Sequence, residues 1–301
     1  MPHGVDLLSR LGVCIERSYP FKGIRYIKGD APSIVAQGQF HGGTGYGVRR
    51  IELNRALIKR AKSLEVDWRF ESAEEITLLS DTVSVNGVTG RYLLAADGLH
   101  SSISRQFGLR LQHSRSPRYG MRQHFSTTPW TDHVEVYWSE HGEAYVTPVD
   151  EHTIGVAFLF NKPKHFDALL EGLPYLKRKL GEPASDLRGA GPFYQRTQRR
   201  VSGRLLLIGD AAGYVDPLTG EGLSVGFKTA MLAVDSVVVD RPEDYERAWR
   251  QAVRRYDLMT RTLLWLTQRT WIRRNLVVIL RRLPWLFNVS LRLLGGSSTL
   301  R

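Results

Sequence analysis

Short apolar segments of two kinds alternate along the chain and predict a mixture of helices and strands. Helical periodicity or continuous apolar character predicts helices over 4–11, 51–63 and 223–239. Alternating or short apolar runs bounded by turn residues predict strands over 23–28, 33–40, 66–71, 75–80, 82–86, 91–96 and 203–209. Asn86-Gly87 predicts a tight hairpin turn between two of these strands.

The pattern changes at about residue 111. Four alternating segments over 119–126, 132–138, 143–149 and 152–160 are separated by turn residues and predict an antiparallel meander. A helical stretch follows, and 189–196 leads the chain back to the strand at 203–209. The order predicts an α/β protein (mixed α+β) with three parts: a discontinuous first domain over 1–110 and 196–245, an inserted antiparallel β domain over 111–195, and a C-terminal helical region over 246–301.

The segment from Gly203 to Gly222 carries the most specific chemistry. Its apolar run delivers Gly209 and Asp210 to the carboxyl end of a buried parallel strand, where ligands of open α/β sheets bind. A carboxylate there can accept hydrogen bonds from sugar or ribityl hydroxyl groups. Gly220 and Gly222 then open an apolar helix, whose free N–H groups and positive dipole end suit an anionic ligand.

Two further segments have the same character. Residues 91–105 predict a strand, an Asp97-Gly98 turn and a helix begun by Ser101. Residues 48–57 predict a helix that presents Arg50 near its start. The glycine-rich stretch at 42–47 is interpreted as a loop, because Val48 stands where the third glycine of a dinucleotide-binding turn belongs.

Together, the three segments resemble the superfamily of FAD-dependent monooxygenases and geranylgeranyl reductases, which has a para-hydroxybenzoate hydroxylase-like fold. Residues 216–222 look most like the reductase branch. The resemblance implies a Rossmann-like FAD-binding domain with cofactor contacts at Arg50, Asp97, Gly98, Gly209, Asp210, Pro217, Gly220, Gly222 and Leu223. It implies that Asp210 binds the ribityl chain, that 217–220 wall the isoalloxazine, and that N–H groups near Gly222 face its N1–C2=O edge.

The sequence departs from that superfamily in two places. Ser104 stands where the family usually has arginine, and Arg105 follows one position later. The family's opening strand, Gly-x-Gly-x-x-Gly turn and helix have no counterpart, and 1–13 resemble a helix that comes after them. We therefore expect a domain that is N-terminally truncated relative to the family. A sheet edge left unpaired by the missing strands should make the chain poorly soluble and weak or inactive in FAD binding.

The resemblance also implies an oxidoreductase with FAD as cofactor and NAD(P)H or another electron donor as external reductant. Two reactions stay open: hydroxylation of a small or lipophilic substrate, and reduction of a carbon–carbon double bond in a polyprenyl-type lipid. Substrate contacts are expected on the inserted sheet at Trp138, Tyr145 and Pro148, although other aromatic positions of the reductase segment differ here. The alternative from another class is a truncated, non-catalytic paralogue that acts as a basic, membrane-associated binding module.

The basic charge is concentrated at the C-terminal end. Residues 247–301 contain twelve arginines and a single acid, Asp257, and so carry +11 of the chain's net charge of +12. The arginines alternate with Trp, Leu, Ile and Val, which suits either a helical pair packed on the flavin domain or a helix lying on an anionic membrane surface. This composition does not favour a nucleic-acid partner.

The number of cysteines and the hydropathy limit the expected cellular location. The single cysteine, Cys14, excludes an intramolecular disulfide and fits a reducing cytoplasm. No run of about 18 apolar residues predicts a spanning helix, so we expect a cytoplasmic protein with peripheral membrane attachment as an option. No His, Cys, Asp or Glu spacing resembles a metal site or a nucleophile triad, and the sequence names no catalytic residue.

Overall fold

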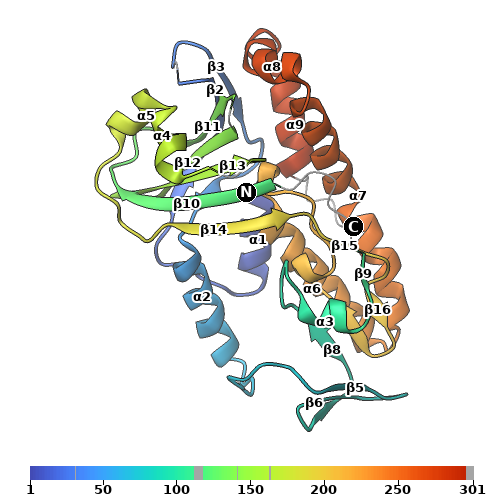
Figure 1. The fold of residues 1–301 in the computed structure, drawn as a ribbon. Coiled ribbons are helices and arrows are strands. Elements are labelled where there is room, and N and C mark those ends of the chain that lie inside the picture. Colours follow the sequence, from blue (N-terminus) through green and yellow to red (C-terminus); the bar gives the residue numbers. More distant parts are fainter. Residues whose placement is uncertain (31, 112–117, 141, 163, 296–301) are drawn as a thin grey trace. The chain divides into compact units, whose positions relative to one another are not determined.

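The computed structural model describes residues 1–30, 32–111, 118–140, 142–162 and 164–295 (Figure 1). The chain divides into two compact units. Unit 1 comprises Met1–Leu64, Ser116–Pro192 and Thr262–Arg301, and unit 2 comprises Glu65–Arg115 and Phe193–Arg261.

Unit 1 is built on a seven-stranded sheet with the order β14-β10-β13-β12-β11-β2-β3. The strands are β2 (Gly23–Lys28), β3 (Val35–Gln39), β10 (Arg118–Ser126), β11 (His133–Ser139), β12 (Gly142–Asp150), β13 (Thr153–Phe160) and β14 (Arg188–Phe193). Strands β11, β12 and β13 form an antiparallel meander, as predicted. The prediction is wrong for β10, which pairs antiparallel with β13 instead of with β11, so the order of the four strands is that of a Greek key. Strand β2 joins β11 in parallel and pairs antiparallel with β3.

The two faces of this sheet bury different partners. One face carries Ile27, Tyr137 and Phe158 and packs against α4 (Phe166–Glu171) and α5 (Pro174–Lys179), which forms the main core of the unit. The other face is covered over β2 and β3 by α8 (Thr270–Arg282) and α9 (Pro284–Gly295) (Figure 1). A Cβ atom on Gly38 of β3 would lie 2.5 Å from the side chain of Leu291, so glycine permits this close approach.

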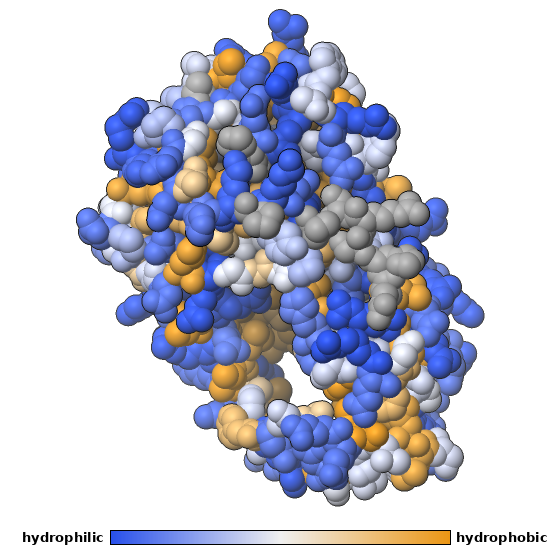
Figure 2. All heavy atoms as spheres, viewed as in Figure 1, coloured by the Kyte–Doolittle hydropathy of each residue, from blue (hydrophilic) through white to orange (hydrophobic). Residues whose placement is uncertain are grey.

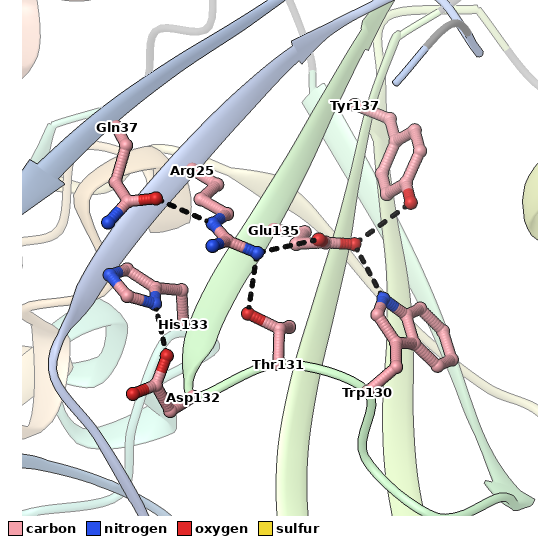
Figure 3. Close-up of polar contacts among 8 residues, drawn as sticks. All are labelled: Arg25, Gln37, Trp130, Thr131, Asp132, His133, Glu135 and Tyr137. Atoms are coloured by element: carbon pink, nitrogen blue, oxygen red, sulfur yellow. Dashed lines mark hydrogen bonds and ion pairs between the residues drawn. The ribbon is translucent and has the colours of Figure 1, made fainter. Parts of the chain in front are cut away.

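The core face contains one buried polar cluster, drawn in Figure 3. The carboxylate of Glu135 accepts hydrogen bonds from the Trp130 indole (3.0 Å) and the Tyr137 hydroxyl (2.9 Å) and pairs with Arg25 at 3.9 Å. Arg25 also donates to Gln37 and Thr131, so the cluster ties β2, β3 and β11 together. Its polar groups bond one another, and we interpret it as a structural cluster.

Removing one bond of this cluster should lower stability by a small amount. In Tyr137→Phe the buried ring stays, but Glu135 loses one donor, and we expect unfolding to become easier by about 1 kcal/mol. Urea unfolding measures the difference. Tyr46→Phe, at an exposed position of the same unit, is the matched control and should change little. Equal stability of Tyr137→Phe and wild type would contradict this interpretation.

Smaller elements complete unit 1. They are α1 (Pro2–Arg10), β1 (Tyr19–Phe21), β4 (Gly45–Gly47) and α2 (Arg50–Lys62). Strands β1 and β4 pair with each other, and β4 lies directly on β12, because a Cβ on Gly47 would be only 1.7 Å from the carbonyl oxygen of Pro148. The start of α2 is thereby held beside the end of β12.

Unit 2 contains a sheet of order β16-β17-β8, a sheet of order β5-β6-β7, and the pair β9–β15. Its elements are β5 (Ile76–Leu78), β6 (Val83–Val85), β7 (Val88–Gly90), β8 (Leu93–Ala95), α3 (Ser102–Gln106), β9 (Arg110–Leu111), β15 (Arg196–Thr197), β16 (Val201–Ser202), β17 (Leu205–Leu207), α6 (Gly222–Val238) and α7 (Pro242–Thr267), of which α7 continues past the unit boundary. Leu205 and Leu207 pack into one cluster and Leu206 into another, which explains the continuous apolar run. The hairpin at Asn86-Gly87 is confirmed, with positive φ at both residues.

One predicted strand is wrong, and the compact units divide the chain differently from the predicted domains. The predicted strand over 66–71 is wrong: Val66, Trp68 and Phe70 are exposed and pair with no strand among the described residues, so their alternation reflects no buried face. The compact units also differ from the predicted domains. Residues 1–64 join the antiparallel sheet rather than the first domain, because β2 pairs with β11 across more than a hundred residues.

The basic C-terminal region is not a separate part either. Most of α7 belongs to unit 2, whereas α8 and α9 pack on the sheet of unit 1. Across the described residues, every helix is too short or too polar to cross a membrane. On the face that Figure 2 draws, polar side chains predominate and apolar ones lie in small scattered groups.

Candidate flavin site

The parallel pairing of β8 with β17 brings two of the sequence motifs together in unit 2. Ala95 pairs with Leu207, and the N–H of Ile208 donates to the Ala95 carbonyl at 2.9 Å. The Asp97-Gly98 turn and the Gly209-Asp210 turn therefore leave the same edge of the sheet from adjacent strands. Ligands of open α/β sheets bind at this edge.

The backbone at this edge can approach a ligand closely. Gly209 has φ of +59°, and an added Cβ would lie 3.9 Å from the Cα of Gly226, so the turn packs against α6 through two glycines. Gly98 and Gly220 also have positive φ, and a Cβ on either would meet no atom within 4 Å. The main chain at these two positions therefore faces open space, which fits the cradle that a dinucleotide cofactor needs.

Helix α6 starts at the same site. Its first intrahelical bond runs from Val225 N–H to the Glu221 carbonyl at 3.0 Å, so the N–H groups of Gly222 and Leu223 come before the hydrogen-bonded helix. Leu223 is exposed, and Pro217 lies in a short 3-10 turn whose start is capped by the Asp216 carboxylate. The end of this 17-residue helix can bind a partial negative charge.

The Asp-Gly turn is stabilised from within. The Asp97 carboxylate accepts from the Ile103 N–H (3.2 Å), and Ser101 caps α3 by accepting from the Ser104 N–H (2.9 Å). The helix predicted to begin at Ser101 is therefore confirmed. Arg105 donates to the carbonyls of Ser101 and His100, whereas Ser104 is fully buried. Arg105, one place later than the family's arginine, thus fixes the shape of this turn.

Three carboxylates surround one tyrosine of α7. Burial raises the pKa of Tyr256, and the negative charges of Asp216, Asp210 and Glu221 raise it further. The Tyr256 hydroxyl donates to the Asp216 carbonyl at 3.2 Å. Burial also raises the pKa of Glu221 to about 7. Asp210 is half-buried and lies at the start of this acidic group, at the ligand edge of β17.

The remaining candidates lie in unit 1. Arg50 is the first residue of α2 and is exposed. Tyr145 and Trp138 share the face of the sheet opposite α4 and α5, where Trp138 is buried against Tyr26 at a ring distance of 5.2 Å and Tyr145 is half-buried. Pro148 lies on the other face, paired with Ile154, so the sheet does not bring it together with Trp138 and Tyr145.

Curated proteins of similar sequence fall into a few enzyme types. The menaquinone reductase of Mycolicibacterium smegmatis is 32% identical over 185 residues, which are 54% of this chain and 45% of that protein. The ubiquinone hydroxylase UbiL of Rhodospirillum rubrum is 25% identical over 257 residues, covering 73% of this chain and 56% of its own length. The digeranylgeranylglycerophospholipid reductase of Methanococcus aeolicus is 23% identical over 236 residues, with 69% and 60% covered. No protein-family model matches the chain.

Solved structures agree with these relatives at the level of the fold. The flavin-dependent brominase Bmp2 superposes with a TM-score of 0.79 over 98% of this chain and 83% of its own, at 17% identity. The chain therefore shares the fold of flavin-dependent enzymes, and its sequence resembles those of the three curated enzymes. The Diels-Alderase PyrE3 also matches, with a TM-score of 0.76 at 20% identity over the whole chain and 72% of PyrE3. This FAD-dependent oxidoreductase fold is the mixed α/β fold predicted from the sequence.

The chain spans about half the length of the curated relatives that it matches. Sequence reasoning singled out Asp210 at its ligand edge but passed over Glu221 and Tyr256. A glutamate between two glycines at a predicted helix start was the available signal for Glu221, whereas the contribution of Tyr256 depends on how α7 packs. In the part of the chain that the structure describes, no group of three His, Cys, Asp or Glu side chains could hold a metal ion.

Proposed function

We propose that the chain binds FAD at the shared edge of β8 and β17 and serves a flavin-dependent oxidoreductase reaction on a lipophilic substrate. The observation that carries the proposal is the in-register parallel pairing of Ala95 with Leu207, which sets Asp97-Gly98 beside Gly209-Asp210. Neither motif alone defines a site, but adjacent turns at the carboxyl edge with the start of α6 next to them supply complementary groups for a dinucleotide.

Each part of the site has a role that follows from its chemistry. Asp210 would accept a hydrogen bond from a ribityl hydroxyl, and the open backbone at Gly98 would lie along the pyrophosphate. Pro217 to Gly220 would wall the isoalloxazine, and the N–H groups of Gly222 and Leu223 would stabilise negative charge at its N1–C2=O edge. FAD supplies the redox chemistry, and NAD(P)H or another donor supplies the electrons.

The substrate class follows from the relatives rather than from a pocket. Their names refer to menaquinone, ubiquinone and a digeranylgeranyl phospholipid, which supports a lipophilic quinone or prenylated lipid as substrate here. Hydroxylation and double-bond reduction both stay candidates. Tyr145 and the small residues beside it on β13 are the part of the sheet that we propose for substrate contact.

Titration of the purified chain with FAD decides between this proposal and the weak or absent FAD binding expected from the missing opening strand, turn and helix. Quenching of flavin fluorescence that saturates with protein would support the proposal. Weaker FAD binding by a variant altered at the β8–β17 edge, such as Asp210→Ala, would locate the site. Absence of any saturable FAD binding would overturn the proposal for this chain and leave the alternative of a non-catalytic binding module.

We also propose an anionic membrane surface as a partner of α8 and α9. Trp271 of α8 and Trp285 of α9 are 69% and 62% exposed, which is unusual for so large an apolar side chain. Arg273 and Arg274 bind Glu143 and Glu140, and the Arg281 guanidinium donates to the Ser33 carbonyl; fewer arginines than the sequence suggested are therefore available to lipid. Tryptophan favours the depth of the lipid headgroups, and basic residues near such a surface contribute about 1 kcal/mol each.

Removal of the exposed tryptophans should weaken this attachment. We expect the double variant Trp271→Ser/Trp285→Ser to co-sediment less with phosphatidylglycerol-containing vesicles than wild type, and wild type to be released as salt rises. Trp68→Ser, at an exposed site in unit 2, is the control and should behave as wild type. Equal recovery of wild type with anionic and neutral vesicles would exclude the anionic surface as partner.

A further inference from the structure

The sheet of unit 1 has an uncovered region on the face opposite α4 and α5. Strand pairing sets Tyr145, Ala157 and Arg122 in one row across β12, β13 and β10. The next row contains Thr147, Gly155 and His124. The middle strand therefore contributes only the small residues Ala157 and Gly155, and both are half-buried. A shallow floor results, with Tyr145 on one side and Arg122 and His124 on the other.

Arginines from two other elements approach this floor. Gly47 is pressed onto the Pro148 carbonyl, so Arg49 and Arg50, which follow it at the start of α2, stand beside the end of β12. On the opposite side, β14 pairs with β10, and Gly189 packs near the Gly120 carbonyl, which sets Arg188 beside Arg122. Three elements thus direct positive charge to one region of the sheet.

The positive charges of these side chains also act on one another. The pKa of Arg122 is lowered, first by burial and then by the positive charges of Arg50, Arg188 and Arg49. Burial, together with the charges of Arg49 and Arg122, lowers the pKa of His124 to about 4, so His124 is neutral at pH 7. Its ring nitrogen Nδ1 lies 3.1 Å from the Ser185 hydroxyl.

The cluster has little compensating negative charge: Asp150 raises the pKa of His124, but burial and the charges of Arg49 and Arg122 outweigh it. Within the described ranges, Arg49, Arg50 and Arg122 form no ion pair, and Arg188 pairs only with the exposed Asp186, at 3.5 Å. Like charges held together destabilise a fold, and proteins retain such groups mainly where an anion neutralises them. The start of the 13-residue helix α2 adds the positive end of its dipole to the same region.

We propose that Arg49, Arg50, Arg122 and Arg188 form a binding site for a phosphate group of a ligand bound on this face of the sheet. Several guanidinium groups around one anion give the forked hydrogen bonds that phosphate oxygens accept best. The phosphate belongs either to a lipid head group of the substrate or to a nucleotide. As a substrate site, the assignment rests on the proposed oxidoreductase function, because the site adjoins Tyr145.

Calorimetric titration of the full chain with two phosphate probes tests the site. Glycerol 1-phosphate represents the lipid head group and ADP the nucleotide, with glycerol and adenosine as their phosphate-free counterparts at constant ionic strength. We expect at least one phosphate probe to bind and its counterpart to fail. Arg122→Gln should weaken that probe by about tenfold or more, the loss expected for one charge-assisted hydrogen bond. Arg178→Gln, an exposed arginine of α5 without an ion pair among the described residues, should leave binding unchanged.

The probes also separate the sources and the hypotheses. Preference for glycerol 1-phosphate assigns the site to a lipid head group, and preference for ADP assigns it to a nucleotide. Arg122→Gln removes a positive charge that its neighbours repel, so we expect this variant to fold. The probe should raise its melting temperature less than it raises that of wild type. Arg49→Gln tests the same effect at the start of α2. Phosphate binding without FAD binding would reject the flavin function but keep the site. Failure of both probes, or binding unaffected by either variant, would overturn the site.

Discussion

Replacing Asp210 with alanine is expected to lower the affinity for FAD by about 10- to 100-fold while the fold persists. The carboxylate lies at the ligand edge of β17, half-buried, in a turn whose backbone is fixed by the positive φ of Gly209. A hydrogen bond from a ribityl hydroxyl group to a charged acceptor contributes about 1.5–3 kcal/mol to binding, and its loss corresponds to this change in affinity. Fluorescence titration with FAD measures the loss, and far-UV circular dichroism reports on the fold.

Asp235→Ala provides the matched control for this experiment. Asp235 belongs to the helix that starts at the same site, but it is exposed and lies more than three turns away from Gly222 at about 3.6 residues per turn. Its removal should leave FAD affinity unchanged. If Asp210→Ala binds FAD as well as Asp235→Ala does, the β8–β17 edge is not the flavin site.

The sequence predicted this edge because its signals are local. A continuous apolar run such as Leu205–Leu207 must be buried on both sides, and a glycine with an acid directly after it ends the strand at a turn. The Asp97-Gly98 turn follows the same logic. Local sequence patterns could not predict that the two turns lie side by side, because the pairing of β8 with β17 joins segments more than a hundred residues apart.

The sequence misled where tertiary contacts, rather than local pattern, determine the structure. Val66, Trp68 and Phe70 alternate like a strand, but the Trp68 and Phe70 rings stack on each other in an exposed segment. The grouping of 1–64 with the antiparallel sheet was not evident for a related reason: β2 has the pattern of an ordinary strand, and nothing in its sequence indicates that its partner is β11. The charge of the C-terminal arginines was evident, but which of them bind Glu143 or Glu140 was not.

The pKa of Glu221 is determined by its burial and not by a local sequence pattern. It lies between Gly220 and Gly222 at the start of α6 and is 7% exposed, and its Oε1 atom makes no hydrogen bond to any described residue. Burial raises its pKa from 4.5 to about 7. An acid whose folded pKa exceeds its unfolded pKa holds more protons in the folded state between those values, so stability falls as pH rises from about 4.5 to about 7.

Replacing Glu221 with glutamine should therefore stabilise the protein at pH 8 and have little effect at pH 4.5. The displacement of the pKa corresponds to about 3 kcal/mol, the cost of an ionised carboxylate at this position, and the neutral amide avoids it at every pH. Urea unfolding of wild type and Glu221→Gln at both pH values measures the difference. Glu243→Gln, at an exposed position in the first turn of α7, is the control and should show no such dependence. A buried acid retained at this cost within the flavin motif is typical of a functional site. An equal effect of Glu221→Gln at both pH values would mean instead that the pKa of Glu221 is not raised in the folded protein.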